Sequence, residues 1–140
     1  FAPRYMHEAI RVYRNHFKPS TYLEKPYVML GVPLVAADTD EHADYLATSV
    51  YQRILALMRG QSLMQRPPVD TMDALWLPHE REAVASFLGL AMVGGPQKIR
   101  AKLDVLLEQT QADELIFTCD LYEHTDRLRS YEILAQTVLG

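Results

Sequence analysis

The chain lacks the features that mark several classes of protein. Its single cysteine, Cys119, excludes an intramolecular disulfide and fits a reducing, cytoplasmic compartment. No apolar run approaches the roughly 18 residues that a membrane-spanning helix needs. The 14 basic residues are scattered among 18 acidic ones, which leaves no basic patch for nucleic acid. We therefore expect neither a membrane nor a nucleic-acid partner.

Apolar residues occupy 49% of the 140 positions, which is enough for a packed core and argues against intrinsic disorder. This length suits one domain, since domains commonly run to about 100–150 residues. The sequence has no low-complexity tract and no internal repeat beyond an alternation of strand and helix signals. A single α/β domain is therefore predicted over residues 1–140.

The clearest structural signal is the passage 94–120, which predicts a turn, a helix and a buried strand in that order. Gly94 and Gly95 mark the turn, and Pro96 stands at the first helical position, where its missing N–H costs nothing. An apolar stripe then recurs at helical spacing, at Ile99, Leu103, Leu106 and Leu107. The run 115–117 is apolar throughout, which is typical of a parallel strand covered on both faces.

Further strands and helices alternate along the chain. The nearly all-apolar run 27–37 predicts a strand with a bend, bulge or partial edge at Pro33. Met92 and Val93 predict a minimal third strand. Helices are predicted at residues 3–17, 40–58, 79–90 and 124–139, with buried faces that include Leu57 or Met58, Leu128, Tyr131, Leu134 or Ala135, and Val138. Strands separated by helices call for parallel pairing with right-handed crossovers.

Two segments admit two interpretations each. The acidic residues at 38–41 form a capping box in outline, with Asp38 as the capping residue; a metal site with His42 is the less favoured alternative. Residues 59–78 have no periodicity and contain a diproline, so an inserted loop excursion is predicted there, either as a lid or as a loose surface loop. Trp76 is expected to anchor this loop to the body of the domain rather than to stack on a ligand.

The order and spacing of these motifs resemble the carboxy-terminal part of the luciferase-like, flavin-dependent monooxygenases, the bacterial luciferase family. The resemblance rests on the turn at 93–96, the strand that opens at Ala112-Asp113-Glu114-Leu115, and the helix through 127–132. It extends upstream to 26–30 and to the turn at 37–41, and so covers most of the chain.

This resemblance implies a partial (β/α)8 TIM barrel, the carboxy-terminal half, with about two to three parallel strands and their covering helices. A complete barrel needs about 250 residues, and the chain starts at Phe1 without a methionine. We therefore expect a piece of a larger protein, whether natural, proteolytic or engineered. Its apolar strand faces then need the missing amino-terminal half, or another copy of the chain in a homo-oligomer, to cover them.

The resemblance also implies an oxidoreductase. The whole enzyme would use reduced FMN, supplied by a separate flavin reductase, and dioxygen to oxidise an organic substrate, while the isolated piece is expected to be inactive. A deazaflavin cofactor stays open, because the residues that would choose it are absent. The alternative from another class is a non-catalytic, self-associating structural or interaction domain without a flavin site.

Candidate site residues follow the ends of the predicted strands, where barrel enzymes carry their chemistry. These cofactor- or substrate-facing candidates are Gly94, Gly95, Cys119, Asp120, Tyr122 and His124. The two glycines open a helix and could bind a phosphate, although a tight turn is the plainer account. Cys119 is expected to be an inert buried thiol, and Tyr122 and His124 either line a cavity or cover the barrel rim. No metal site is predicted, and no catalytic residue is assigned.

Overall fold

The structure is a computed structural model that describes residues 5–140, and it contains every element that the sequence predicts. In chain order these are α1 (Met6–His16), β1 (Met29–Ala36), α2 (Asp40–Met58), α3 (Pro78–Phe87), β2 (Met92–Gly94), α4 (Pro96–Thr110), β3 (Glu114–Thr118) and α5 (His124–Leu139). The bounds of α2 and α5 are those predicted, whereas α3 ends three residues early. The predicted start of the first helix, at Pro3, lies outside the described residues.

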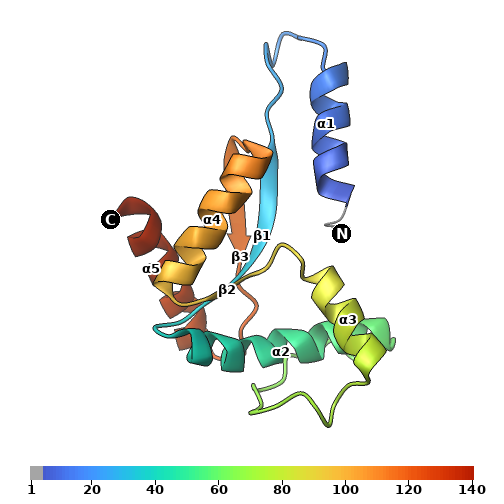
Figure 1. Cartoon of the computed structure of the whole chain (residues 1–140), viewed down its shortest axis with the longest axis vertical. Coiled ribbons are helices and arrows are strands. Elements are labelled where there is room, and N and C mark those ends of the chain that lie inside the picture. The colour runs from blue at the N-terminus through green and yellow to red at the C-terminus, as the bar shows by residue number, and fades with distance from the viewer. Residues whose placement is uncertain (1–4) are drawn as a thin grey trace.

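The three strands form one parallel sheet in the order β2-β1-β3, which confirms the predicted parallel pairing. Strand β3 pairs with residues 29–33 of β1, and β2 pairs with residues 34–36 on the opposite edge. The central strand therefore changes partner along its length (Figure 1). This order also places β2 outside the β1–β3 pair, although it lies between them in the sequence.

Pro33 stands where β1 changes partner. The Ala37 N–H donates to the carbonyl of Gly94 on the β2 side, and alternate residues of a strand point their N–H groups the same way. The nitrogen of Pro33 therefore faces the β2 side, one residue before the β2 pairing begins at Leu34. No ladder hydrogen bond is lost there. The predicted partial edge at Pro33 is confirmed.

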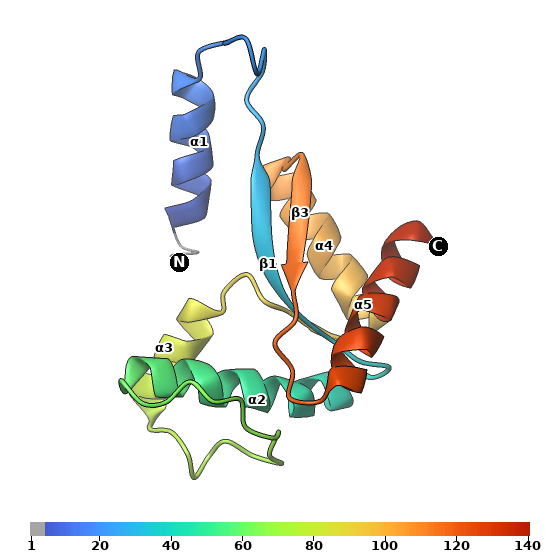
Figure 2. The ribbon, with the colours of Figure 1, turned by 180° about the vertical axis from the view of Figure 1, so that it is seen from behind.

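One face of the sheet is covered and the other is largely bare. Helices α4 and α5 pack on the first face, around a core of Val32, Leu34, Ala36, Met92, Ile99, Leu103, Leu106, Ile133 and Leu134. Figure 2 shows β1 and β3 from the opposite side, with no helix across them. Met29 and Ile116 point to this side and remain 49% and 46% exposed. Within the described residues one apolar face of the sheet is thus left uncovered, as expected from the sequence for strands whose second face needs further chain to cover it.

Several predicted core positions are also exposed. Leu57 and Met58 in α2, Leu107 in α4, and Leu128, Tyr131 and Val138 in α5 all retain more than a third of their surface. Helix α5 buries Ser130 and Ile133 in their place, together with Leu134, which confirms one of the two predicted alternatives at 134 and 135. Helix α2 crosses the carboxyl ends of the strands (Figure 2) and buries the polar Thr48 and Ser49. An apolar stripe alone does not distinguish these faces, because each of these helices carries apolar residues on more than one side.

Ser130 takes the place of a strand at the end of β1. Its hydroxyl donates to the carbonyl of Ala36 at 2.6 Å and accepts the N–H of the same residue at 3.0 Å. These two backbone groups face the β3 side, but the β3 ladder ends at Pro33. Ser130 itself is fully buried. One hydroxyl therefore satisfies both groups of a residue that has no strand beside it on that edge.

Residues 59–77 are fixed to α2 by hydrogen bonds from its polar side chains. The Ser49 hydroxyl donates to the carbonyl of Arg66, and the Gln52 amide donates to the carbonyl of Pro67. The Thr48 hydroxyl accepts the N–H of Val69 at 2.9 Å. Residues 59–77 of the predicted excursion therefore contain no helix or strand, and side chains of α2 hold their middle part in place.

A bidentate ion pair closes this segment. Arg59, at the end of α2, donates through Nε and Nη2 to the two carboxylate oxygens of Glu80, each at 2.7 Å. Glu80 also accepts the N–H of Leu77 at 2.7 Å, at the start of α3. The guanidinium and this N–H lower the pKa of Glu80 from 4.5 to about 2. Both ends of the segment are thus held by the same carboxylate.

We predict that Ser130→Ala lowers the free energy of unfolding by about 1–3 kcal/mol, because two buried backbone groups lose their partner. The control is Thr137→Ala on the same helix, whose hydroxyl bonds only to the carbonyl of Ile133. It should cost less than about 0.5 kcal/mol. Urea unfolding of the three proteins at equal concentration measures the difference. Equal stability of the two variants would contradict the assigned role.

The Glu80 ion pair predicts a specific acid dependence. In the unfolded chain Glu80 takes up its proton near pH 4.5, whereas in the folded chain it does so near pH 2. Between these values the folded state binds fewer protons, so stability is present above pH 4.5 and falls as the pH drops to 2. The Tm advantage of the wild type over Glu80→Gln should therefore shrink across that range and be nearly gone at pH 2. An advantage that stays constant with pH, or an equal trend for Glu82→Gln, would refute this assignment.

Candidate functional site

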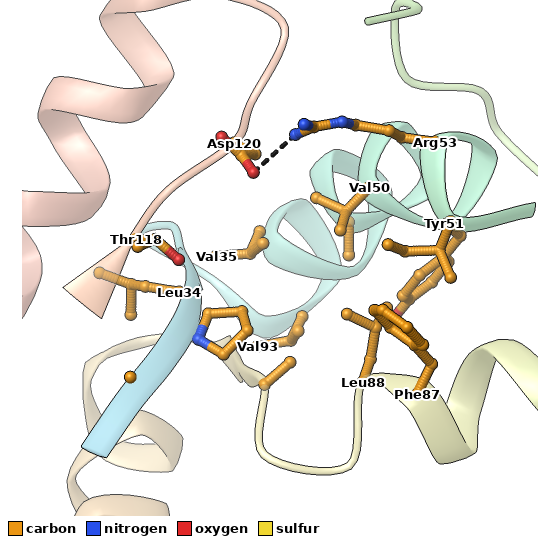
Figure 3. A pocket seen from close by; sticks show the side chains of 15 residues that line it. Leu34, Val35, Val50, Tyr51, Arg53, Phe87, Leu88, Val93, Thr118 and Asp120 are labelled. Carbon is orange, nitrogen blue, oxygen red and sulfur yellow. Dashed lines mark hydrogen bonds and ion pairs between the residues drawn. The ribbon is translucent and has the colours of Figure 1, made fainter. Parts of the chain in front are cut away.

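The main candidate site is an apolar pocket at the carboxyl ends of the strands, between the bare face of the sheet and helices α2 and α3 (Figure 3). Its volume is about 270 Å³. The sheet contributes Val35 and Val93, and α2 contributes Val50 and Ile54. The complete lining is Gly31, Pro33, Leu34, Val35, Ala47, Val50, Tyr51, Arg53, Ile54, Phe87, Leu88, Ala91, Val93, Thr118 and Asp120.

An ion pair spans one side of this pocket. Arg53 on α2 donates to the carboxylate of Asp120, which follows β3, at 2.6 Å (Figure 3). The Gln65 amide donates to the Asp120 carbonyl at 2.8 Å and so adds the loop segment to the same junction. Because the Asp120 side chain is 62% exposed, the pair adds little stability. Its main effect is to join three separate segments at the rim of an apolar cavity.

Tyr51 lines this pocket on the α3 side and contacts Trp76, which is not itself part of the pocket lining. Their rings stack with centroids 5.9 Å apart at an angle of 28°. Burial raises the pKa of Tyr51, so its phenol stays protonated at neutral pH. Trp76 also packs against a small core of Leu55, Met72 and Val84. The structure therefore supports the expectation that Trp76 anchors the loop to the domain.

Of the four candidates after β3, only Asp120 lines the pocket. Cys119 is buried in the core beside α2, and its N–H donates to the hydroxyl of Tyr131 at 3.0 Å. Burial raises the pKa of the Cys119 thiol, which keeps it protonated and a poor nucleophile. Tyr122 and His124 are exposed, and His124 contacts Arg127 on its own helix at 3.2 Å. The structure does not bring these four side chains together.

The two candidate glycines form a tight turn, and the N–H of Gly95, which could bind an anion, already has a partner within the protein. Gly94 has a φ of 152°, and a Cβ there would lie 2.6 Å from the side chain of Lys98. The N–H of Gly95, at the start of α4, donates to the Asp40 carboxylate at 2.7 Å. An internal carboxylate therefore occupies the position at which a phosphate would bind to this helix.

The capping box predicted at Asp38 is wrong. Thr39 is the capping residue of α2, and its hydroxyl accepts the N–H of His42 at 3.1 Å. Asp38 instead pairs with Arg129 on α5 at 2.6 Å, and this guanidinium lowers the pKa of the Asp38 carboxyl. Within residues 5–140, no group of three or more metal-ligating side chains comes together.

The apolar residues that form the pocket were identified in the sequence only as core positions. Val50, Ile54, Phe87 and Leu88 belong to the predicted buried faces of α2 and α3, and each is partly buried. Their periodicity indicates burial but does not reveal that the two helices leave a gap between them and the sheet. Arg53 has no sequence signal, because its pairing with Asp120 spans 67 positions.

The described residues do not by themselves form a flavin site. The only cation that lines the pocket, Arg53, is already paired with Asp120, and the N–H at the start of α4 is taken by Asp40. A cavity of about 270 Å³ with apolar walls fits the apolar part of an organic molecule better than a phosphorylated cofactor. No helix in residues 5–140 is long and apolar enough to cross a membrane.

Comparison with known proteins gives several similar chains. YvbT of Bacillus subtilis, an uncharacterised protein, is 47% identical over 135 residues, which are 96% of this chain and 40% of that protein. A luciferase-like monooxygenase of Escherichia coli K12 is 38% identical over 133 residues, which are 95% of this chain and 40% of the relative. No protein-family model matches the chain.

The fold has a counterpart among solved structures. The crystal structure of apo-MsnO8 aligns with a TM-score of 0.73 at 24% identity, covering 96% of this chain and 41% of that one. This chain therefore spans about two-fifths of the length of the relatives it matches. Over nearly its whole length, it matches a part of the luciferase-like monooxygenases.

Proposed function

We propose that the chain is the carboxy-terminal part of a flavin-dependent monooxygenase that oxidises an organic substrate with reduced FMN and dioxygen. The observation that carries this proposal is the apolar pocket at the carboxyl ends of parallel strands, where barrel enzymes place their sites. The similarity to a protein named as a luciferase-like monooxygenase supports the reaction class. FMN is preferred over a deazaflavin on family resemblance alone, and a separate reductase would supply it in reduced form.

The proposed architecture is a partial (β/α)8 barrel in which β1 and β3 are neighbouring barrel strands. Their parallel pairing over residues 29–33 and the helices α4 and α5 on one face support this proposal. Strand β2 would be an accessory strand, because it joins the outer edge of β1 only at residues 34–36. Residues 59–78 would be an insertion that folds over the strand ends, and residues 1–140 a single unit.

In this proposal the chain supplies a dry, apolar wall, while the flavin is held by residues of the remaining part of the protein. The flavin, when bound, would supply the oxidation chemistry. Val35, Val50 and Val93 would exclude water from the apolar part of the substrate. The Arg53–Asp120 pair would fix the loop after β3 against α2 and so set the width of the pocket mouth. The isolated chain would be inactive.

The bare face of the sheet supports a second part of the proposal, which concerns partners. Met29 and Ile116 on this face are half exposed. Within the described residues, no strand pairs with residues 29–33 along the edge of β1 where β2 pairs with residues 34–36. Helix α1 stands beside β1 with no buried residue (Figure 1). Relatives about 2.5 times as long provide enough additional chain to cover both. Without that chain, a second copy would cover the face, as the alternative function of a non-catalytic, self-associating domain also requires.

A chimera tests the enzymatic proposal. The matching 133 residues of the Escherichia coli relative are replaced by this chain, and reduced FMN is titrated under anaerobic conditions. We expect the chimera to bind reduced FMN within about tenfold of the affinity of the intact relative, whereas the amino-terminal part alone should bind at least about a hundredfold more weakly. A folded chimera, verified by circular dichroism, that does not bind FMN would refute the proposal.

The same chimera separates the pocket from the flavin site. Val50→Trp fills the cavity and should abolish binding of naphthalene, a neutral apolar probe, while leaving the affinity for FMN unchanged. Val138→Trp, at a position 46% exposed on α5, is the matched control and should change neither. If naphthalene binds equally to both variants, the proposal that this pocket holds the apolar part of the substrate is contradicted.

The isolated chain should self-associate through the bare face, because burying apolar surface is favourable at about 25 cal/mol per Å². Sedimentation velocity should give a weight-average mass that exceeds the mass of one chain and rises with protein concentration. Ile116→Lys should shift it to the monomer, whereas Leu128→Lys, at a similarly exposed position on α5, should not. A compact wild-type monomer would refute this expectation. A discrete oligomer together with an inactive chimera would favour the non-catalytic alternative.

A further inference from the structure

A second cavity, of about 510 Å³, opens between α2, α3, β2 and α4. It shares Tyr51, Leu88, Ala91 and Val93 with the apolar pocket but has a different character, and we call it the lysine cavity. Its complete lining is Asp44, Tyr51, Trp76, Arg81, Val84, Ala85, Leu88, Gly89, Ala91, Val93, Lys98 and Lys102. Its volume lies within the range of about 300–1,000 Å³ that is usual for small-molecule sites.

The lysine cavity is lined by more basic than acidic side chains. Arg81, Lys98 and Lys102 line it, against a single carboxylate, Asp44. Among the described residues, none of these three cations forms an ion pair. By contrast, ion pairs with carboxylates are formed by Arg11, Arg53, Arg59, Arg100 and Arg129. The contact of the Lys102 ammonium with the Ala91 carbonyl is long, at 3.5 Å.

The two lysines are held close to each other. They are four positions apart on α4 and therefore lie on the same face of the helix. Burial, followed by the charge of Lys98, lowers the pKa of Lys102, and the carboxylates of Asp44 and Asp40 only partly offset this shift. Gly94 leaves room for the Lys98 stem, because a Cβ at position 94 would lie 2.6–2.9 Å from three of its carbons. An anion between the two ammonium groups would relieve both their repulsion and their loss of hydration.

The remainder of the wall suits a flat apolar group. The stacked rings of Tyr51 and Trp76 lie on one side, and Val84, Leu88 and Val93 provide aliphatic surface. Three helices contribute cavity residues at helical spacing: 44 and 51 from α2, 81, 84 and 85 from α3, and 98 and 102 from α4. The cations and the aromatic surface are therefore placed by regular elements rather than by a loop alone.

We propose that the lysine cavity binds a small organic anion, in which a flat apolar body carries one phosphate or carboxylate group. The anion would lie near Lys98, Lys102 and Arg81, and the body would pack against Trp76, Tyr51 and Leu88. This site adjoins the apolar pocket and shares Tyr51 and Leu88 with it, but it uses neither Arg53 nor Asp120. It does not depend on the assignment of a flavin-dependent reaction. It can be tested on the 140-residue chain.

Trp76 is the only tryptophan of the chain, so its fluorescence reports directly on this cavity. The probes are phenyl phosphate, benzoate, phenol and inorganic phosphate, each added at fixed ionic strength. We expect saturable binding of phenyl phosphate or benzoate, with phenol and inorganic phosphate at least about tenfold weaker, because each lacks one half of the recognised group. The stronger of the two anions identifies the headgroup.

The double variant Lys98→Gln/Lys102→Gln should weaken binding of the preferred anion by at least about tenfold, since two charged donors are lost. Lys18→Gln/Lys25→Gln, at two exposed positions before β1, is the matched control and should bind as the wild type. Isothermal titration calorimetry repeats the measurement without relying on fluorescence, and circular dichroism verifies folding. The proposal is overturned if neither anion binds saturably by both methods, or if the folded Lys98/Lys102 variant binds as tightly as the control.

Discussion

The backbone of β1 is the constraint on which the rest of the structure depends. A buried strand needs partners for the N–H and carbonyl groups on both edges, and no single element supplies them here. Strand β3 serves residues 29–33, β2 serves residues 34–36 on the other edge, and Ser130 serves Ala36 where β3 has ended. These partners come from positions up to 94 residues away in the chain. The positions of β2, β3 and the start of α5 are therefore tied to one central strand.

This arrangement also creates the apolar pocket. Because β3 leaves the sheet at Thr118, the loop that follows turns across the strand ends, where Asp120 meets Arg53 of α2. Helix α2 lies across the same ends and presents Ala43, Leu46 and Ala47 to Val35 and Val93. Ala43 and Ala47 leave room for this close approach, and Val50 and Ile54, further along α2, line the cavity.

The sequence allowed prediction of the helices and strands. It did not allow prediction of which helix faces are buried or of which polar side chains pair across the fold. The run 27–37 and the stripe of Ile99, Leu103 and Leu106 carry local signals that survive in the structure. Helix α5 has apolar residues on several sides. Its periodicity predicted that Leu128 and Tyr131 are buried against the sheet, but Ser130 and Ile133 are the residues buried there. The choice depends on the backbone groups of Ala36, which are remote in the sequence. Remote partners also explain two other features that the sequence did not reveal. Asp38 pairs with Arg129, which leaves Thr39 as the cap of α2, and Arg53 pairs with Asp120, which lies 67 positions away.

The distribution of charge decides what the strand ends can bind. Asp40 neutralises the start of α4, Asp38 pairs with Arg129, and Asp120 pairs with Arg53, so the groups best placed to hold a phosphate beside the apolar pocket already have internal partners. On the far side of β2, Lys98, Lys102 and Arg81 line a cavity with only one carboxylate, Asp44, and among the described residues they form no ion pair. A pocket whose only cation is already paired favours an uncharged group, whereas a cavity with an excess of basic side chains favours an anion. The chain thus separates the two kinds of recognition on opposite sides of Val93, which lines both cavities.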